Sequence, residues 1–434
     1  MSPVSPVRAW WTMAVLSLAY VMSFVDRQVL TLLIDPIRAD LKITDTQVSL
    51  LTGVAFALLY ATTAVPIARY ADRYGRKPVI LAGVTLWGSM TAACGLAQNF
   101  WALFAARMGV GLGEAALTPQ GYALSAELFP PAQRNRAMSV FVVGSAIGAG
   151  VSLLIGAAAL GIVTAAAEHF PLLGILQPWQ GVFVLLGVLT LMLIPLIATI
   201  VERPRAAQPP PEERKARAAL AMIWRNRGAF TPHFVALPLL SLSSYGIAAW
   251  LPSHFIRDFG WSASEVGLAL GLLLVVTGLI GCAWAAFAAD WLYAKGRSNA
   301  SLWLLLVSTF ISLPFLALGM ASDDARTGMA WLAAFFVINQ GANTLAPAAL
   351  QAIVPDGIRG EVSALWLMVV NLVGIGLGPT ITAVTADYLV GEDSRIGDAI
   401  ALVGVSCTLA GLLIAAASAK AYTRAVRDPA GLAA

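Results

Sequence analysis

The sequence predicts an all-α membrane protein whose 12 transmembrane helices form two pseudo-symmetric six-helix bundles, with both chain termini in the cytoplasm. Three observations support this prediction. Of the 434 residues, 59% are hydrophobic and 12% are charged, whereas a soluble domain carries about 25% charged residues. The apolar residues gather in runs long enough to cross a bilayer. The two halves of the chain also resemble each other.

The apolar runs define the predicted spans. A bilayer core of about 30 Å requires about 20 apolar residues per helix. Twelve such runs begin near residues 9, 48, 78, 100, 137, 179, 229, 262, 299, 327, 361 and 399. Because lipid offers the backbone no hydrogen-bond partner, each run is predicted to be a helix. The first run is too long for the apolar core of a signal peptide and lacks a small-residue cleavage site, so we expect it to be retained.

Lysine and arginine set the predicted orientation. Of these 27 residues, two lie inside spans and five fall in the predicted outer loops: Arg38, Lys42, Arg257, Arg326 and Arg395. Because cytoplasmic loops carry an excess of basic residues, both termini are predicted to be cytoplasmic, in a plasma membrane or a bacterial inner membrane. The same distribution accounts for the net charge of +4, so nothing indicates nucleic-acid binding.

The chain divides into three predicted parts. Residues 1–201 form the amino-terminal bundle, 202–228 a cytoplasmic linker with a short amphipathic helix, and 229–434 the carboxy-terminal bundle. We expect the basic residues of the linker to rest against anionic lipid headgroups. The stretch "TDTQVSLLTG" (44–53) aligns with "SASEVGLALG" (262–271), which indicates an internal duplication. Duplicated bundles of this kind commonly hold a substrate between the halves and expose it alternately.

Four ionisable residues lie deep within the predicted spans: Asp26, Arg27, Arg107 and Glu114. A charge at the bilayer centre costs about 2.5–3.5 kcal/mol, so we expect these side chains to face the bundle interior and pair. Arg107 and Glu114 are seven residues apart and share one helix face. Asp26 is expected to bridge to Arg107, while Arg27 either reaches Glu114 or points into a cavity.

Two interpretations of these four residues stay open. In one, they are a fixed ion-pair network that joins the first and fourth spans. In the other, Asp26 and Glu114 exchange protons, while Arg27 and Arg107 tune them and engage an anionic substrate group. Burial favours the neutral form of a carboxyl group and a nearby arginine favours its charged form, so remaking a pair moves a proton. A proton gradient is then the expected energy source.

The second half has no mid-span charge and offers neutral polar side chains instead. Each alone is more often an interhelical hydrogen-bonder than a ligand. Clustered over three spans, they are predicted to line the substrate cavity, and the residues proposed for this role are Tyr245, Asn339, Asn343 and Asn371.

Several kinds of chemistry have no sequence support. The chain contains no G-x-x-x-x-G-K-[ST] phosphate loop. Its three cysteines show no CxxC or Cys/His spacing, and its three histidines fall at predicted loops or span ends, so no metal site is expected. We therefore predict no enzymatic activity, no metal and no cofactor.

One loop resembles a known family. "ARYADRYGRKP" (68–78) is similar to the cytoplasmic G-x-x-x-D-R-x-G-R-K signature of the major facilitator superfamily, with Ala68 in place of the usual glycine. In that superfamily the loop locks the outward-facing state, with the aspartate near a helix amino terminus. The resemblance implies a major facilitator fold and a conformational gate made of Asp72, Arg73, Arg76 and Lys77.

Three further stretches resemble the spinster branch of that superfamily: "FVDR" (24–27), "NFWALFAARMGVGLGEA" (99–115) and "ELFPPAQRNRAMSVF" (127–141). The branch is associated with lysophospholipid- and sphingolipid-like substrates. The resemblance therefore implies a proton-coupled, alternating-access carrier of an amphipathic molecule, which we expect to be a monomer. The alternatives are a proton-coupled porter of sugar acids or other small organic anions, and a multidrug exporter. Drug/proton antiporters of the superfamily are expected to carry a Gly-Pro in the fifth span. Here the Gly-Pro, Gly378-Pro379, lies in the eleventh span, which counts against the multidrug alternative.

Overall fold

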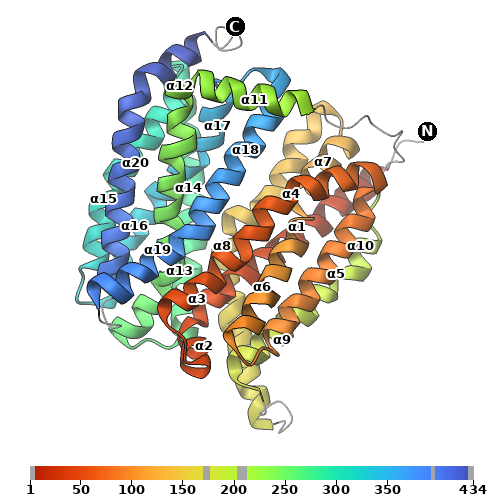
Figure 1. Ribbon diagram of the computed structural model, residues 1–434, viewed down its shortest axis with the longest axis vertical. Helices are drawn as coiled ribbons and strands as arrows, with labels where there is room; N and C mark the ends of the chain where they lie inside the picture. Colours follow the sequence, from red (N-terminus) through yellow and green to blue (C-terminus); the bar gives the residue numbers. More distant parts are fainter. Residues whose placement is uncertain (1–4, 170–175, 203–212, 392–395, 429–434) are drawn as a thin grey trace. The chain divides into compact units, whose positions relative to one another are not determined.

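A computed structural model describes residues 5–169, 176–202, 213–391 and 396–428, and every regular element in these ranges is a helix (Figure 1). The described residues contain ten helical stretches long and apolar enough to cross a membrane. These are Pro6–Leu32, Asp45–Tyr74, Phe100–Leu128, Gly148–Ala167, Pro178–Ala198, Arg227–Phe259, Ala263–Ala294, Ala300–Met320, Arg359–Val390 and Ile396–Arg427. The predicted third and tenth spans are occupied by α5 and α16, which are helices outside these ten. The count of twelve spans and the cytoplasmic termini stay predictions.

The chain separates into two compact units. Unit 1 holds residues 1–210 and 260–275, and unit 2 holds residues 211–259 and 276–434. The segment 260–275 therefore groups with the first unit, although it lies within the predicted carboxy-terminal bundle, residues 229–434.

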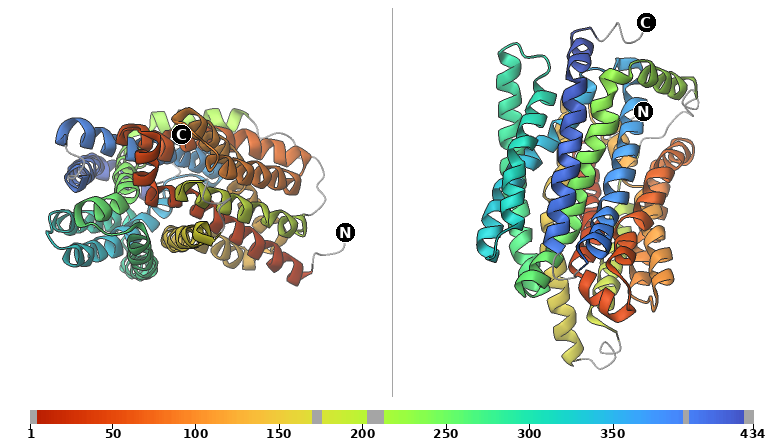
Figure 2. Two further views of the ribbon diagram at one scale, coloured as in Figure 1. Left: turned by 90° about the horizontal axis from the view of Figure 1, so that it is seen from below. Right: turned by 60° about the vertical axis from the view of Figure 1, so that its left-hand side comes forward.

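Unit 1 is a bundle built around α1, α5 and α6. Its helices are α1 (Pro6–Leu32), α2 (Ile34–Leu41), α3 (Asp45–Thr52), α4 (Val54–Tyr74), α5 (Arg76–Cys94), α6 (Phe100–Glu114), α7 (Thr118–Leu128), α8 (Pro131–His169), α9 (Pro178–Leu191) and α10 (Leu193–Ala198). Helix α1 packs along α8, and α5 packs against both α6 and α9. The views in Figure 2 show these helices from their ends and from the side.

Glycine and proline place Glu114 at a specific depth in unit 1. Helix α6 comes so close to α5 that a Cβ on Gly113 would lie 2.6 Å from the carbonyl oxygen of Gly83. The helix ends at Glu114, and α7 begins at Thr118 with Pro119 in its first turn, where a missing N–H costs nothing. The buried carboxyl group of Glu114 thus stands at a break between two helices, next to α5.

Unit 2 contains the remaining helices. They are α11 (Glu213–Arg225), α12 (Arg227–Thr231), η2 (Pro232–Ala236), α13 (Leu237–Phe259), α14 (Ala263–Ala294, whose first residues group with unit 1), α15 (Ala300–Met320), α16 (Ala325–Thr344), α17 (Ala346–Gln351), η3 (Asp356–Ile358), α18 (Arg359–Asn371), η4 (Leu372–Leu377), α19 (Gly378–Thr385), η5 (Ala386–Val390) and α20 (Ile396–Arg427). Helix α13 packs against α20, η4 and α19, while α15 packs against α16 and α20.

Helix α11 lies within the predicted linker. Its side chains Ala219 and Met222 are buried in the hydrophobic core of unit 2, and the helix packs on α18 and η3. Figure 1 shows α11 running across the end of the upright helices of its unit. One face of the linker helix therefore packs on protein, and only the opposite face is available to headgroups.

Candidate functional site

The four deep charges predicted from the sequence all lie in unit 1. Asp26, Arg107 and Glu114 have exposed fractions of 0%, 1% and 1%, and the side chain of Arg27 is 16% exposed. Burial of this degree requires hydrogen-bond or ion-pair partners, because an unpaired charge in a low-dielectric interior is costly. The partners found for each differ in part from those predicted.

Asp26 is held by neutral donors. Its Oδ2 atom accepts hydrogen bonds from Trp87 Nε1, from Thr91 Oγ1 at 3.4 Å and from Thr190 Oγ1 at 3.2 Å. Trp87 and Thr91 are one turn apart on α5, and Thr190 comes from α9. The carboxyl group of α1 is therefore fixed by two other helices through one of its two oxygens.

Arg27 and Glu114 form a direct ion pair between α1 and α6. Arg27 Nε donates to Glu114 Oε2 at 2.6 Å, and Nη2 lies 2.6 Å from the same oxygen. Of the two positions predicted for Arg27, the structure shows the one that reaches Glu114. The charge-assisted contact is short, as expected for arginine and carboxylate.

Aromatic rings surround the guanidinium of Arg27. Its Cζ lies 5.3 Å from the ring centroid of Phe24, 4.7 Å from that of Phe56 and 4.6 Å from that of Tyr60. Each ring face attracts a cation, and desolvation strengthens the attraction. Arg27 is thus stabilised by both its ion pair and its ring neighbours.

Arg107 does not pair with the Asp26 carboxylate, so the predicted bridge between the two side chains is wrong. Arg107 Nη1 instead donates to the main-chain oxygen of Asp26 at 3.0 Å, and Nε donates to the main-chain oxygen of Leu51 at 3.4 Å. Backbone carbonyls are good partners for the five fixed donors of a guanidinium. Arg107 therefore ties α6 to α1 and α3, and its predicted role with substrate stays a prediction.

Each of the two buried carboxyl groups keeps one oxygen without a hydrogen-bond donor. Within the described ranges, no donor reaches Asp26 Oδ1 or Glu114 Oε1. A buried oxygen that gives up water without gaining a partner is unfavourable. Protonation at that oxygen removes the buried negative charge and leaves Oδ2 and Oε2 able to accept the same hydrogen bonds, although the contact of Glu114 with Arg27 is then no longer an ion pair.

An aromatic row continues from Phe24 into the rest of unit 1. Tyr20 lies edge-on to Phe24 at 5.3 Å and stacks on Phe141 at 4.7 Å, and Tyr122 meets Phe141 edge-on at 5.5 Å. Phe141 is buried against Gly121, where a Cβ would lie 2.4 Å from its ring. Tyr20 and Phe141 are buried, whereas Tyr122 is 36% exposed, so the row has a buried middle and an accessible phenol at one end.

The predicted substrate residues of unit 2 fall into two places. Tyr245, 38% exposed, packs its ring against Gly374 of η4, where a Cβ would lie 2.9 Å from Tyr245 Cδ2. Asn371 is the last residue of α18, directly before η4. Asn343 Nδ2 donates to Asn339 Oδ1 at 2.9 Å along α16. Their part in binding stays a prediction.

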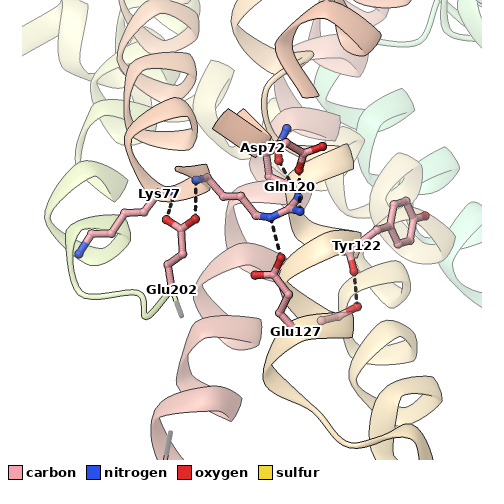
Figure 3. A network of polar contacts seen from close by, with 8 residues as sticks. Asp72, Lys77, Gln120, Tyr122, Glu127 and Glu202 are labelled. Atoms are coloured by element: carbon pink, nitrogen blue, oxygen red, sulfur yellow. Dashed lines mark hydrogen bonds and ion pairs between the residues drawn. The ribbon is translucent and has the colours of Figure 1, made fainter. Parts of the chain in front are cut away.

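The four predicted gate residues lie where α4 ends and α5 begins, and Arg76 is the centre of a polar network (Figure 3). Arg76 is 5% exposed. Its Nη2 donates to Asp72 Oδ1 at 2.8 Å, its Nη1 to Gln120 Oε1 at 3.0 Å and its Nε to Glu127 Oε1 at 3.1 Å. The guanidinium thus joins α5 to α4 and α7.

Glu202 caps α5 from 125 residues further along the chain. Its Oε1 accepts from the main-chain N–H of Arg76 at 2.7 Å, and its Oε2 accepts from that of Lys77 at 3.0 Å. A carboxylate is favoured at a helix amino terminus, where N–H groups lack partners. Asp72 lies in the last turn of α4 and accepts a hydrogen bond from Arg76 Nη2, and its expected place near a helix amino terminus stays a prediction.

The remaining gate residues play smaller parts in this structure. Arg73 lies 5.3 Å from the ring centroid of Tyr74, and Lys77 contributes its main-chain N–H to Glu202.

Among the described residues, no group of three or more His, Cys, Asp or Glu side chains is arranged to hold a metal ion.

Sequence reasoning missed several partners of the site. They are Trp87, Thr91 and Thr190 around Asp26, Phe24, Phe56 and Tyr60 around Arg27, and Gln120, Glu127 and Glu202 around Arg76. One signal was available for the first set: Trp87 and Thr91 place two hydrogen-bond donors one turn apart in an apolar span. The others gave no signal because aromatic rings and single polar residues are common near span ends.

Known proteins resemble this chain over most of its length. A family model described as Major Facilitator Superfamily matches residues 16–379. An "MFS-type efflux pump" of Mycolicibacterium smegmatis is 28% identical over 98% of this chain and 96% of its own. A "Hexuronate transporter" of Bacillus subtilis is 25% identical over 92% of each chain, and "Protein spinster homolog 1" of Xenopus tropicalis is 26% identical over 85% of this chain and 71% of its own.

A solved structure shares the fold. The crystal structure of a bacterial homolog to the human lysosomal transporter Spinster, in an inward-facing and occupied conformation, matches with a TM-score of 0.79. The two chains are 23% identical, and the match covers 98% of each.

Proposed function

The chain belongs to the Major Facilitator Superfamily and resembles its spinster branch, and on that premise we propose that it is a proton-coupled transporter that moves an amphipathic, lipid-like molecule by alternating access. The substrate class we infer is the lysophospholipid or sphingolipid type. We further infer twelve spans, both termini in the cytoplasm and a monomer in a plasma or bacterial inner membrane.

The observation that supports proton coupling is a pair of buried carboxyl groups, in each of which only one oxygen has a hydrogen-bond donor within the described ranges. Asp26 and Glu114 each bind their partners through one oxygen and leave the other buried without a donor among the described residues. Burial favours the neutral form of both groups, and protonation removes the buried negative charge; at Glu114 it also weakens the charge-assisted contact with Arg27. Two such groups on adjacent helices make a proton-exchange site without histidine.

The Arg27–Glu114 pair can link proton exchange to substrate binding. Arginine stays charged at any physiological pH, so a proton taken up by Glu114 leaves Arg27 with an unbalanced positive charge. An anionic substrate group can then replace the carboxylate against the guanidinium. Uptake of the proton and binding of the anion are thereby linked, and this link is the proposed coupling step.

The rings near Arg27 support an amphipathic substrate. A headgroup phosphate fits the planar donors of Arg27, and the apolar part of the same molecule fits beside the partly accessible ring of Phe24 and the exposed ring of Tyr122. Aromatic faces bury apolar area without requiring a hydrogen bond. A compact polar anion would leave the exposed ring of Tyr122 without a contact.

A small organic anion is the second candidate. The observation in its favour is the 25% identity with a hexuronate transporter across 92% of both chains. In that case Arg27 and the phenol groups of Tyr60 and Tyr122 would bind the sugar acid. A multidrug exporter is a further alternative, suggested by the name of the efflux-pump relative.

A ligand-stabilisation screen separates the candidates. We would measure the melting temperature of purified protein with lysophospholipids, sphingoid bases, hexuronates and cationic dyes, in wild type and in Arg27→Gln. We expect stabilisation by lysophospholipids or sphingoid bases in wild type alone. Stabilisation by hexuronates without any by the lipids would assign the sugar-acid function, and an equal response of both proteins would remove Arg27 from the binding site.

A further inference from the structure

The turn between α14 and α15 in unit 2 has a rigid backbone. Gly296 adopts φ +80°, and the main-chain N–H groups of Gly296 and Arg297 donate to the carbonyl oxygens of Tyr293 at 2.9 Å and Leu292 at 3.1 Å. These two hydrogen bonds form the Schellman motif that ends many helices at glycine. Lys295 and Arg297, on either side of the glycine, are therefore presented by a fixed backbone.

Both basic residues of this turn lie over exposed tryptophans. Lys295 Nζ is 3.6 Å from the ring centroid of Trp291, and Arg297 Cζ is 5.4 Å from that of Trp303. The two tryptophans are 58% and 42% exposed. A cation over a ring loses part of its conformational freedom before any ligand arrives, and that lowers the entropy cost of binding.

The carboxyl end of α20 adds basic residues beside the turn. Asn299, at the start of α15, donates to Thr423 Oγ1 at 3.1 Å, which brings α20 against the turn. In this region α20 carries exposed Lys420, Arg424 and Arg427, and the end of α20 and the turn lie at one end of the unit in Figure 2. The acidic residues of the same segments are Asp290 and Asp428. Among the described residues, no ion pair of Lys295, Arg297, Lys420 or Arg424 is present.

Tryptophan and basic residues at the end of spanning helices indicate which partner covers them. Trp is enriched at the boundary between the hydrocarbon core and water, and clusters of Lys and Arg at that boundary bind anionic headgroups. Helix α11 at the same end carries 75% exposed Trp224 beside Arg225. From the tryptophan–cation pairs and the basic end of α20, we propose that the α14–α15 turn binds the phosphate of an anionic phospholipid of the surrounding bilayer.

The test uses purified full-length protein and phosphatidylglycerol as the probe, with phosphatidylcholine for comparison. Bound lipid is counted by native mass spectrometry, and the melting temperature is measured in mixed micelles. Wild type should retain phosphatidylglycerol and be stabilised by it, less so at high salt. Lys295→Gln and Arg297→Gln together should weaken this binding by about fivefold per neutralised charge. The single variant Trp291→Leu, which keeps both charges, should weaken it less.

The matched control is Arg326→Gln, which removes one exposed charge at the opposite end of α15, where α16 begins. It should bind phosphatidylglycerol like wild type. The measurement is repeated in the Arg27→Gln background, which disables the proposed substrate site and so separates a boundary lipid from a transported one. Equal retention by wild type and the double variant would overturn the proposal. So would saturation of the thermal shift by soluble glycerol phosphate, or displacement of the lipid by an acidic peptide.

Discussion

Arg27 Nε and Glu114 Oε2 lie 2.6 Å apart, and they join α1 to α6 by an ion pair inside the membrane-spanning part of unit 1. The carboxylate has no other partner among the residues that the structure describes, whereas the guanidinium also contacts three rings. The two members of the pair are therefore unequal, because Glu114 depends on Arg27 more than Arg27 depends on Glu114.

This inequality predicts different outcomes for the two partners. Glu114→Gln should fold and bind substrate, because Arg27 keeps its rings and its charge, but gradient-driven transport should fall at least tenfold. Arg27→Lys keeps the charge but loses the planar fork, so substrate binding should weaken by about tenfold or more. Uptake into proteoliposomes with and without an imposed pH gradient measures transport by Glu114→Gln. The thermal shift with substrate measures binding by Arg27→Lys. Full gradient-driven uptake by Glu114→Gln would contradict the coupling role.

Asp26→Asn should separate transport from coupling. The asparagine amide oxygen can still accept from Trp87, so folding and membrane insertion should be preserved, while the proton-accepting oxygen is lost. Uphill transport should be abolished, and substrate exchange without a gradient should continue. The control is Thr91→Val, which removes the 3.4 Å donor but keeps the carboxyl group and should remain coupled. Undiminished uphill transport by Asp26→Asn would remove this residue from the mechanism.

Glu202→Ala should loosen the start of α5. The two main-chain N–H groups of Arg76 and Lys77 would lose their acceptor, which is the loss of a helix cap and costs about 0.5–2 kcal/mol of stability. Because the gate loop begins there, the transport rate should change while substrate affinity stays as it is. Thermal unfolding measures the loss of stability. Transport assays over a range of substrate concentrations give the maximal rate, which should change, and the half-saturating concentration, which should not. Glu127→Gln, which leaves the cap intact, is the comparison, and an unchanged melting temperature in Glu202→Ala would mean that the cap is dispensable.

Gly121→Ala should destabilise unit 1 by about 1–3 kcal/mol, since its Cβ would press on the Phe141 ring at 2.4 Å. That ring cannot turn aside easily because it is buried and stacked against Tyr20. Gly161→Ala on α8 is the matched control, because nothing lies within 4 Å of its Cβ position. Adding Phe141→Leu to Gly121→Ala should recover part of the loss. Equal melting temperatures for the two alanine variants would contradict the packing argument.

A helix cap outside the spanning segments predicts one pH effect. The main-chain N–H of Thr327 donates to Asp324 at 2.9 Å and its hydroxyl does the same, and these hydrogen bonds hold the pKa of Asp324 below its usual value. A depressed pKa means that this stabilisation is present above about pH 4 and is lost as the pH falls below it. Asp324→Asn should therefore lower the melting temperature slightly at pH 7, and this difference from wild type should shrink as the pH falls below about 4. Asp323→Asn, with the same change of charge next door, should show no such difference.

The sequence predicted the helical class and the deep charges, and it offered the Arg27–Glu114 pair as one of two alternatives for Arg27. Helical periodicity and the cost of lipid-exposed charge are local properties, so they can be read from a single chain. The partners of Asp26 could not be predicted, because Thr190 lies 164 residues away and only the packing of α9 on α5 brings it close. The predicted bridge from Asp26 to Arg107 is wrong, because the charges of two side chains do not show that main-chain oxygens lie nearer to the guanidinium.

The cap on α5 bears on how the polypeptide could be assembled from pieces. Among the residues that the structure describes, the side chains that bind Arg76, from Asp72 to Glu202, all precede residue 203, while α11 begins at Glu213. A backbone cut between 203 and 212 would therefore leave the first fragment with all of the contacts around Arg76 described above. The second fragment would keep the amphipathic helix α11. Co-expressed as two separate polypeptides, the fragments should each keep these local tethers and reconstitute a working carrier.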